Sequence, residues 1–261
     1  MTASTTTAAN DGPRTAPGWY VISLRPRGDH DAMRRAAARA GAGLIALSPW
    51  RIDARDDGAT RDALARALSA PVIVVTSPAA VRAAARLAAL GEVRATWLAV
   101  GRTTAAALRR AGVVDVTSPA RMDSEGLLAL PALQAVDGVD VALVTAPGGR
   151  GELAPALTAR GARVRRADVY QRTPTPPPPR ALAALRALDA PAVLAVSSGE
   201  ALQRTLAGVP ANVAAILRAQ RVAVASARLG ELARASGFTR IVVADGPRPR
   251  DLVAAAARSL R

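Results

Sequence analysis

Short runs of aliphatic and β-branched residues alternate along the chain with longer alanine-rich stretches. The clearest short runs are WYVISL, PVIVVT, TWLAV, DVALVT, AVLAV, RVAVA and RIVVA, which have the length and composition of buried strands. Stretches with helical spacing follow most of them, such as PAAVRAAARLAAL and RTTAAALRRAG. Regular alternation of strands and helices predicts an α/β fold with parallel sheets.

The pattern also repeats over a long distance. The stretch that begins at Gly18 is similar to the one that begins at Gly138, and 138 − 18 = 120. At this spacing Trp50 corresponds to Tyr170, and PVIVVTSPAAV from Pro71 corresponds to PAVLAVSSGEAL from Pro191. Two copies of a long unit indicate a duplication rather than a solenoid. We therefore expect two similar α/β domains, which suits a length of 261 residues.

Composition narrows the classes of ligand. The net charge is +15, and all 35 basic residues are arginine, which we attribute partly to coding bias. The chain has no dense basic run with interleaved aromatic residues and no zinc-ligand spacing, so nucleic acid is not the expected partner. The basic balance favours a small polycarboxylate or phosphorylated ligand instead. The absence of cysteine excludes disulfides and cysteine catalysis.

The N-terminal residues 1–18 lack the apolar segment of a signal peptide and are predicted to be a disordered tail. No apolar run reaches the roughly 18 residues that span a bilayer. We therefore expect a cytoplasmic protein with no membrane partner. The tract TPTPPPP favours polyproline II and is interpreted as a stiff spacer, with a ligand for a proline-recognising domain as the alternative.

Polar residues gather where the predicted strands end, the edge at which open parallel sheets bind ligands. Thr76 or Ser77 is placed to cap the helix after PVIVVT, and Thr103 or Thr104 the helix after Gly101. An ordinary N-cap explains each such segment, but free amides at helix starts also bind anions. The other candidates for anion binding are Gly149 and Arg150 in APGGRGEL, with Ser197, Ser198, Ser226 and Arg228 in the second half.

His30 is the only histidine, and its place near a helix start predicts a surface position. A Ser-His-Asp triad and a histidine-rich metal site are therefore disfavoured. Tyr170, one of only two tyrosines, ends a strand-like run before the proline tract. It is either a packed strand residue or a hydroxyl held at a cleft.

The ordered set of motifs resembles the uroporphyrinogen-III synthase family from about Val21 to the C-terminus. The resemblance rests on Arg25-Pro26 after the first strand, TSPAAV, VGRTTAAAL with Thr104, SEGLL, GGRGEL, GARV, VYQR, SSGEAL and VASARLGELA. It implies two α/β domains joined by a two-stranded β-ladder, with the active site in the interdomain cleft. Domain 1 would be residues 19–43 and 173–261, the ladder 44–52 and 164–172, and the inserted domain 2 residues 53–163.

The resemblance further implies an enzyme that cyclises hydroxymethylbilane to uroporphyrinogen III, inverting ring D and releasing water, without metal or organic cofactor. The substrate carries eight carboxylates, so arginines and cap amides are suitable ligands. Tyr170 would be the catalytic residue, assisting departure of the substrate hydroxyl. A monomer is expected. The alternatives are a non-catalytic relative that binds a tetrapyrrole or another acid as a regulator, and a two-domain binding protein for a small acid.

Overall fold

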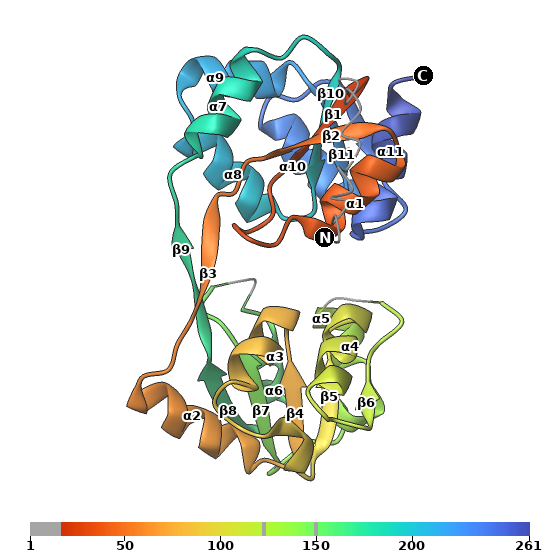
Figure 1. Ribbon diagram of the computed structural model, residues 1–261. Helices are drawn as coiled ribbons and strands as arrows, with labels where there is room; N and C mark the ends of the chain where they lie inside the picture. Colours follow the sequence, from red (N-terminus) through yellow and green to blue (C-terminus); the bar gives the residue numbers. More distant parts are fainter. Residues whose placement is uncertain (1–16, 122–123, 149–150) are drawn as a thin grey trace, which may run out of the picture. The chain divides into compact units, whose positions relative to one another are not determined.

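The computed structural model describes residues 17–121, 124–148 and 151–261 of the chain. It is an α/β protein that divides into two compact units (Figure 1). Unit 1 contains the residues up to Arg51 and those of Pro174–Arg261, whereas unit 2 is the continuous segment Ile52–Thr173. The α/β class expected from the alternating pattern is confirmed.

Unit 1 is built on a five-stranded parallel sheet with the strand order β12-β11-β10-β1-β2. Its strands are β1 (Trp19–Ser23), β2 (Ala42–Ala46), β10 (Ala192–Val196), β11 (Arg221–Val224) and β12 (Ile241–Val243). Its helices are α1 (Asp31–Arg39), α7 (Pro179–Arg186), α8 (Gly199–Gly208), α9 (Ala211–Arg218), α10 (Ala227–Ala235) and α11 (Pro249–Ser259).

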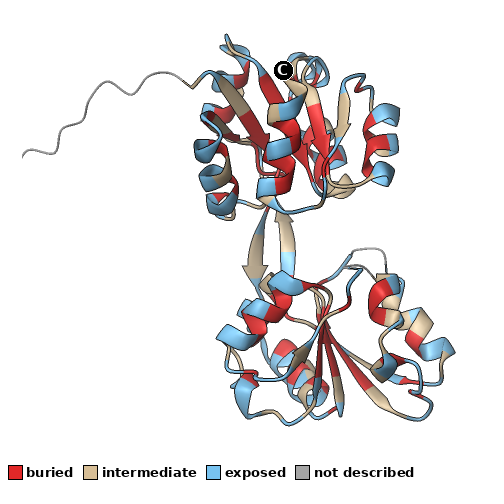
Figure 2. Cartoon of the chain, turned by 90° about the vertical axis from the view of Figure 1, so that its right-hand side faces the viewer, coloured by how far each residue is buried: buried red, intermediate tan, exposed pale blue. Residues whose placement is uncertain are grey.

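The sheet of unit 1 is buried because helices cover it. Val21 and Val193 pack with Met33 of α1 and Leu252 of α11 in one apolar cluster. Each of the central strands β1, β10 and β11 ends in a run of buried residues, as expected for parallel strands covered on both faces. Figure 2 shows the buried strands at the centre, with the exposed faces of the helices outside.

Unit 2 has a second five-stranded parallel sheet, in the order β6-β5-β4-β7-β8. Its strands are β4 (Val72–Val75), β5 (Thr96–Ala99), β6 (Val116–Thr117), β7 (Asp140–Thr145) and β8 (Arg163–Asp168). Its helices are α2 (Gly58–Leu68), α3 (Pro78–Ala84), η1 (Leu90–Glu92), α4 (Arg102–Arg110), α5 (Ser124–Leu128), η2 (Pro131–Leu133) and α6 (Leu153–Ala159).

The core of unit 2 lies on both faces of its sheet because successive side chains of a strand point to opposite sides. Ile73 and Val75 join the cluster that includes Leu64 of α2 and Leu108 of α4. Val74, between them, joins a different cluster with residues of α5 and α6. The continuous apolar run VIVV is therefore explained by burial on two faces.

The strands that pass between the units differ from the expected ladder 44–52 and 164–172. The two-stranded sheet consists of β3 (Trp50–Ala54) and β9 (Tyr170–Pro174), and the boundary between the units falls inside both strands. Residues 44–46 belong to β2, and residues 164–168 to β8, so each expected ladder strand covers parts of two strands. The three residues 47–49, which end in Pro49, separate β2 from β3, and the single residue Val169 separates β8 from β9.

The duplication is visible in the order of the strands. Both sheets place their strands equivalently when β1, β2, β10, β11 and β12 are matched with β7, β8, β4, β5 and β6. Strands β3 and β9 are 120 residues apart, since 170 − 50 = 120. The helix caps Ser77 and Ser198 are 121 apart, however, so the spacing of 120 inferred from Pro71 and Pro191 shifts by one residue in this module.

His30 is buried, and the predicted surface position is wrong. Its Nδ1 lies 3.0 Å from Ser23 Oγ and its Nε2 lies 2.7 Å from Ser48 Oγ. The ring is thus held between the end of β1 and the turn that precedes β3. Burial lowers the pKa of His30, and the charges of Arg25 and Arg34 lower it further, while two nearby aspartates oppose them.

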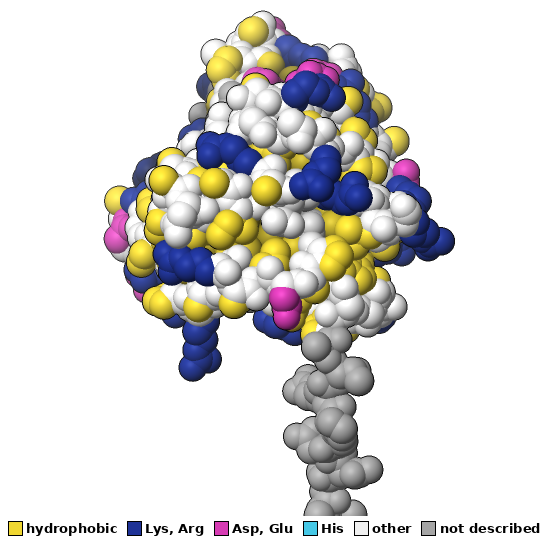
Figure 3. All heavy atoms as spheres, turned by 90° about the horizontal axis from the view of Figure 1, so that it is seen from above, with side chains coloured by type: hydrophobic (Ala, Val, Ile, Leu, Met, Phe, Trp, Pro, Cys, Tyr) yellow, Lys and Arg dark blue, Asp and Glu magenta, His cyan; other side chains and the backbone are white. Residues whose placement is uncertain are grey.

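Basic side chains occur at several separate places on one face of the chain. Figure 3 shows them there among apolar and uncharged groups, with a few acidic side chains. Among the described residues, no helix has the length and hydropathy needed to cross a bilayer.

Candidate functional site

Three of the residues predicted to lie at the site meet at one cavity of unit 2. Thr76 and Ser77 follow β4, and Tyr170 begins β9. The cavity has a volume of about 210 Å³ and lies at the carboxyl ends of β4 and β7, the edge at which parallel sheets bind ligands. Its polar wall consists of Thr76, Ser77, Ser124, Thr145, Glu152, Arg166, Tyr170 and Arg172.

Tyr170 combines the two roles that its sequence position left open. Its ring is 3% exposed and belongs to the apolar cluster of unit 2, so it packs as a strand residue does. Its hydroxyl lies 3.1 Å from Ser77 Oγ at the wall of the cavity. The ring is therefore fixed by packing, and the hydroxyl is positioned by a hydrogen bond across 93 residues of sequence.

Ser77 is fixed by its role as the N-cap of α3. Its backbone is extended, with φ −161° and ψ 157°, and its Oγ accepts a hydrogen bond of 3.1 Å from the Ala80 N–H. Pro78 has no N–H, so this helix start has few free amides to offer an anion. The structure favours the hydroxyl of Ser77 over the helix amides as the group that faces a ligand.

A second hydroxyl pair joins the neighbouring strands β4 and β7. Thr76 Oγ1 lies 2.7 Å from Thr145 Oγ1, and the Thr76 N–H donates to the Val144 carbonyl at 3.2 Å. The strands pair in parallel register with Val75 opposite Val144, which brings the two threonines together. Thr145 was not among the predicted site residues, although it ends the apolar run DVALVT just as Thr76 ends the run PVIVVT.

Two arginines also line the cavity, and neither was predicted. Arg166 on β8 donates from Nε to Asp168 Oδ1 at 2.9 Å and from a terminal nitrogen to the Ala146 carbonyl at 2.9 Å. These bonds hold the guanidinium beside the cavity. Arg172 lies two residues after Tyr170 on β9 and also lines the cavity. The motif VYQR contains Arg172, but only its tyrosine was interpreted.

Other predicted residues of unit 2 lie elsewhere. Gly101 is the N-cap of α4 and has an extended backbone, so neither Thr103 nor Thr104 caps this helix, as had been expected. Thr104 is 1% exposed inside the helix and does not line the cavity. Gly149 and Arg150 lie outside the described residues.

The remaining predicted residues lie in unit 1. Arg25 donates to Asp29 through its Nε and a terminal nitrogen, at 2.8 Å to the carbonyl and 2.6 Å to the carboxylate. Ser198 caps α8 and Ser226 caps α10, each accepting from the backbone three residues on, whereas Ser197 and Arg228 are exposed. Three of these residues therefore already have structural roles.

The cavity defines a class of ligand. Hydroxyl groups and two guanidinium groups form most of its polar wall, with one carboxylate, Glu152. Such a wall suits a ligand with hydroxyl and carboxylate groups. No group of three histidine, aspartate or glutamate side chains that could hold a metal ion occurs in residues 17–121, 124–148 and 151–261. The fold and cavity thus define a two-unit α/β protein with a cavity at the carboxyl edge of a sheet, lined by groups that suit a small anion.

Comparison with known proteins identifies the family. The model of the family described as uroporphyrinogen-III synthase HemD matches residues 31–254, and the chain belongs to this family. The chain is 39% identical over 152 residues to the uroporphyrinogen-III synthase of Salmonella typhimurium and 36% identical over 151 residues to that of Escherichia coli K12. Each match covers 57% of this chain and 61% of the relative, so the chain spans about three fifths of the length of these curated relatives.

Solved structures agree on the fold. A mutant uroporphyrinogen III synthase from the extremely thermophilic bacterium Thermus thermophilus superposes with a TM-score of 0.62 at 19% identity, covering 92% of this chain and 98% of that one. A uroporphyrinogen-III synthetase from Helicobacter pylori 26695 also superposes with a TM-score of 0.62 at 13% identity, covering 93% of this chain and 99% of that one. At these identities the likeness shows the fold alone, and it confirms the two α/β units joined by a strand pair.

Proposed function

We propose that the protein is a uroporphyrinogen-III synthase, which cyclises hydroxymethylbilane to uroporphyrinogen III with inversion of ring D and release of water. The single observation that carries the proposal is the Tyr170 hydroxyl, held 3.1 Å from Ser77 Oγ at a cavity with two arginines. Family membership supplies the reaction class, and the cavity supplies groups that suit a carboxylate-rich substrate.

The hydrogen bonds suggest an order of proton donation. Ser77 Oγ accepts from the Ala80 N–H, which leaves its own proton free to donate to the Tyr170 oxygen. The phenol proton of Tyr170 is then free to point into the cavity. In this arrangement Tyr170 donates to the substrate hydroxyl as the carbon–oxygen bond breaks, and the hydroxyl leaves as water.

The arginines have a different role. Arg166 and Arg172 would bind carboxylates of the tetrapyrrole and so orient the ring that must invert. Orientation is central, because the substrate also closes spontaneously, without inversion, and effective molarities of oriented reactants reach about 10⁵ M and above. The proposed reaction needs no metal or organic cofactor. The proposal includes a monomeric, cytoplasmic enzyme whose two units act as domains around the substrate, with Arg25, Ser197, Ser198, Ser226, Arg228, Gly101, Thr104, Gly149 and Arg150 as further binding residues.

The test supplies freshly generated hydroxymethylbilane to the purified protein and separates the oxidised uroporphyrin isomers. Formation of the type III isomer, unaffected by a metal chelator, is the expected result. Production of only the type I isomer at the rate of the protein-free control would refute the proposal.

A further inference from the structure

Unit 1 contains a second cavity, separate from the one that holds Tyr170. It is a groove of about 310 Å³, formed by the edge strand β2, the helix α7 and the loop between β1 and α1. The residues that line it are Arg27, His30, Leu44, Ile45, Ala46, Ser48, Pro178, Arg180, Ala181 and Ala184. Its volume lies at the lower end of the range for small-molecule sites, roughly 300–1,000 Å³, so it suits a compact ligand.

The floor of the groove is apolar. Leu44, Ile45 and Ala46 of β2 line the groove together with Ala181 and Ala184 of α7, and none of these side chains carries a polar atom. Such a floor favours the flat or aliphatic body of a ligand over a purely inorganic ion.

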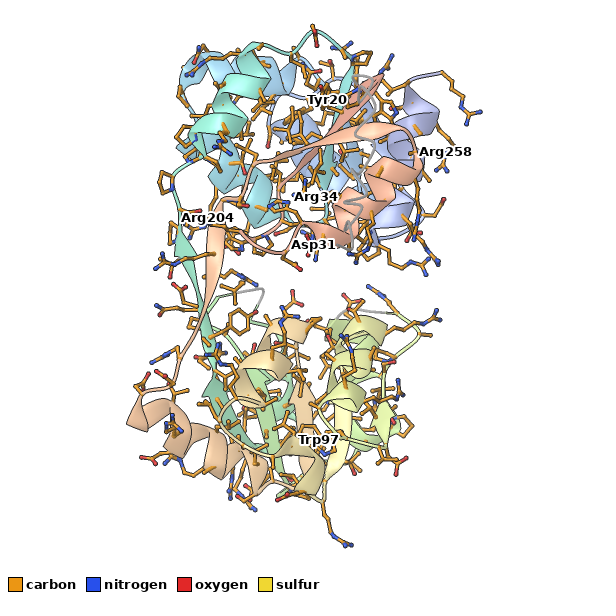
Figure 4. The ribbon with its side chains drawn as sticks, viewed as in Figure 1. Tyr20, Asp31, Arg34, Trp97, Arg204 and Arg258 are labelled. Carbon is orange, nitrogen blue, oxygen red and sulfur yellow. The ribbon has the colours of Figure 1, made fainter. Side chains whose placement is uncertain are left out.

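The uncharged polar side chains of the wall, His30 and Ser48, already have hydrogen-bond partners. His30 is 6% exposed and Ser48 is 5% exposed. The two ring nitrogens of His30 both have protein partners, because one bonds to Ser48 Oγ at 2.7 Å and the other to Ser23 Oγ at 3.0 Å. Burial lowers the pKa of His30, and the charges of Arg25 and Arg34 lower it further, while Asp29 and Asp31 oppose them. Figure 4 labels Arg34 on α1, the helix that His30 precedes.

Two cations at the groove have no partner among the residues that the structure describes. Arg27 and Arg180 are exposed, and neither side chain forms a hydrogen bond or ion pair with the described residues. Within that part of the chain, no acidic residue lines the groove. An apolar floor with unpaired guanidinium groups is complementary to one kind of ligand, a carboxylate attached to an apolar body.

We propose that this groove is a second ligand site, which binds a small organic acid through Arg27 and Arg180 and packs its apolar body against β2 and α7. The site is independent of the proposed catalytic cavity, because all of its residues belong to unit 1 and all residues of that cavity belong to unit 2.

The imidazole NMR signals of His30 can report on ligand binding at this groove. Because it is the only histidine, the tag-free chain labelled with ¹⁵N-histidine gives a single set of imidazole signals, from the wall of the groove. Benzoate, titrated at constant pH and ionic strength, is expected to shift these signals saturably with a Kd on the order of 1 mM. Benzamide, the neutral analogue, is expected to bind at least about tenfold more weakly, because it lacks the charge that pairs with arginine.

Variants test which groups bind. Arg27→Gln and Arg180→Gln should each raise the Kd for benzoate roughly threefold to tenfold, as expected for exposed charge pairs. Ala184→Glu places a carboxylate at the groove and should abolish binding by repulsion. Arg35→Gln is the matched control, because Arg35 is exposed on α1, does not line the groove and loses the same charge.

The proposal is overturned if the His30 signals do not move at benzoate concentrations well above about 1 mM, or if benzamide binds as tightly as benzoate. It is also overturned if Arg35→Gln weakens binding as much as the two groove variants. Each outcome is independent of catalysis, so loss of the synthase assignment would not affect it.

Discussion

Replacing Tyr170 with phenylalanine removes one oxygen atom from the candidate active site and keeps the packed ring. The ring is 3% exposed in the core of unit 2, so the aromatic packing should survive the change. Ser77 keeps its bond from the Ala80 N–H and borders the cavity, so no buried polar group is left without a partner. The cost to folding is that of one neutral hydrogen bond, about 1 kcal/mol, which corresponds to roughly 3–5 °C in Tm.

The effect on catalysis should be larger. Loss of a general acid typically lowers a rate by about 10²–10⁴-fold. We expect a smaller fall, of at least about tenfold in kcat, because the substrate hydroxyl leaves readily and water can enter to replace the phenol. A tenfold fall corresponds to about 1.4 kcal/mol of transition-state stabilisation, which is comparable to the strength of the lost hydrogen bond.

The assay measures the initial rate of type III isomer formation from hydroxymethylbilane, beside a thermal melt of each variant. Tyr20→Phe is the matched control, because Tyr20 is the other tyrosine, lies in unit 1 and loses the same atom. It should leave kcat unchanged. If Tyr170→Phe keeps full activity while folded, or if both variants lose activity equally, the hydroxyl of Tyr170 has no catalytic role.

A double-mutant cycle with Ser77→Ala separates positioning from catalysis. Ser77→Ala removes both the helix cap and the hydrogen bond to Tyr170, so a stability loss of about 1–2 kcal/mol is expected. If Ser77 acts through Tyr170, the double variant should have nearly the kcat of Tyr170→Phe alone. Full additivity of the two losses in kcat would show that Ser77 acts on the substrate independently.

Three further outcomes are expected. The pKa of His30 is lowered in the folded state, so the unfolded state takes up the proton first as the pH falls below about 6.5, and the free energy of unfolding decreases. His30→Gln should therefore make the free energy of unfolding, measured in urea, depend less on pH between about pH 7 and 5. Gly91→Ala should destabilise the protein by about 1–3 kcal/mol in the same assay, because the new Cβ would lie 2.8 Å from the Gly112 carbonyl oxygen. The fragment 52–173 should fold alone with a cooperative melt followed by circular dichroism, since it contains a complete five-stranded sheet, and a non-cooperative melt would show that unit 2 needs unit 1.

The sequence was most informative where burial imposes a pattern. All seven strands predicted from apolar runs are present, because central parallel strands are buried on both faces and read as continuous apolar segments. The cap of α3 was predicted as Thr76 or Ser77, and Ser77 fills it, since a hydroxyl at a strand-to-helix turn satisfies a free helix amide. Ser198 and Ser226 were predicted to bind an anion, and they also prove to be helix caps.

The pattern was less informative where structure depends on distant partners. His30 lies near a helix start, which predicted a surface position, but Ser23 and Ser48 supply hydrogen bonds from 7 and 18 residues away. The end of β8 and the start of β9 are separated only by Val169, which carries no glycine or proline signal. β8 pairs with β7 in the five-stranded sheet, whereas β9 pairs with β3. These partners are distant in sequence, so the local sequence around Val169 does not show where one strand ends and the other begins.

The duplication allows the two units to be compared position by position. After β4 and its equivalent β10, both units keep a pair of hydroxyl residues: Thr76 and Ser77 in unit 2, Ser197 and Ser198 in unit 1. In both, the second hydroxyl caps the following helix. This part of the site is therefore a property of the shared scaffold and does not by itself distinguish a catalytic unit from a binding unit.

The other half of each site has diverged. At a spacing of 120 residues, Thr145 and Tyr170 of unit 2 correspond to Arg25 and Trp50 of unit 1. Trp50 has no hydroxyl group, and Arg25 binds Asp29. The hydrogen bond between a tyrosine hydroxyl and a capping serine, Tyr170 and Ser77, is therefore a feature of unit 2 without an equivalent at Trp50. If the reaction requires a proton donor at the departing hydroxyl, the positioned phenol of Tyr170 makes unit 2 the expected source of that donor. The substitution of Tyr170 therefore tests more than one residue, because it tests whether divergence after duplication placed the proton donor in one of the two units.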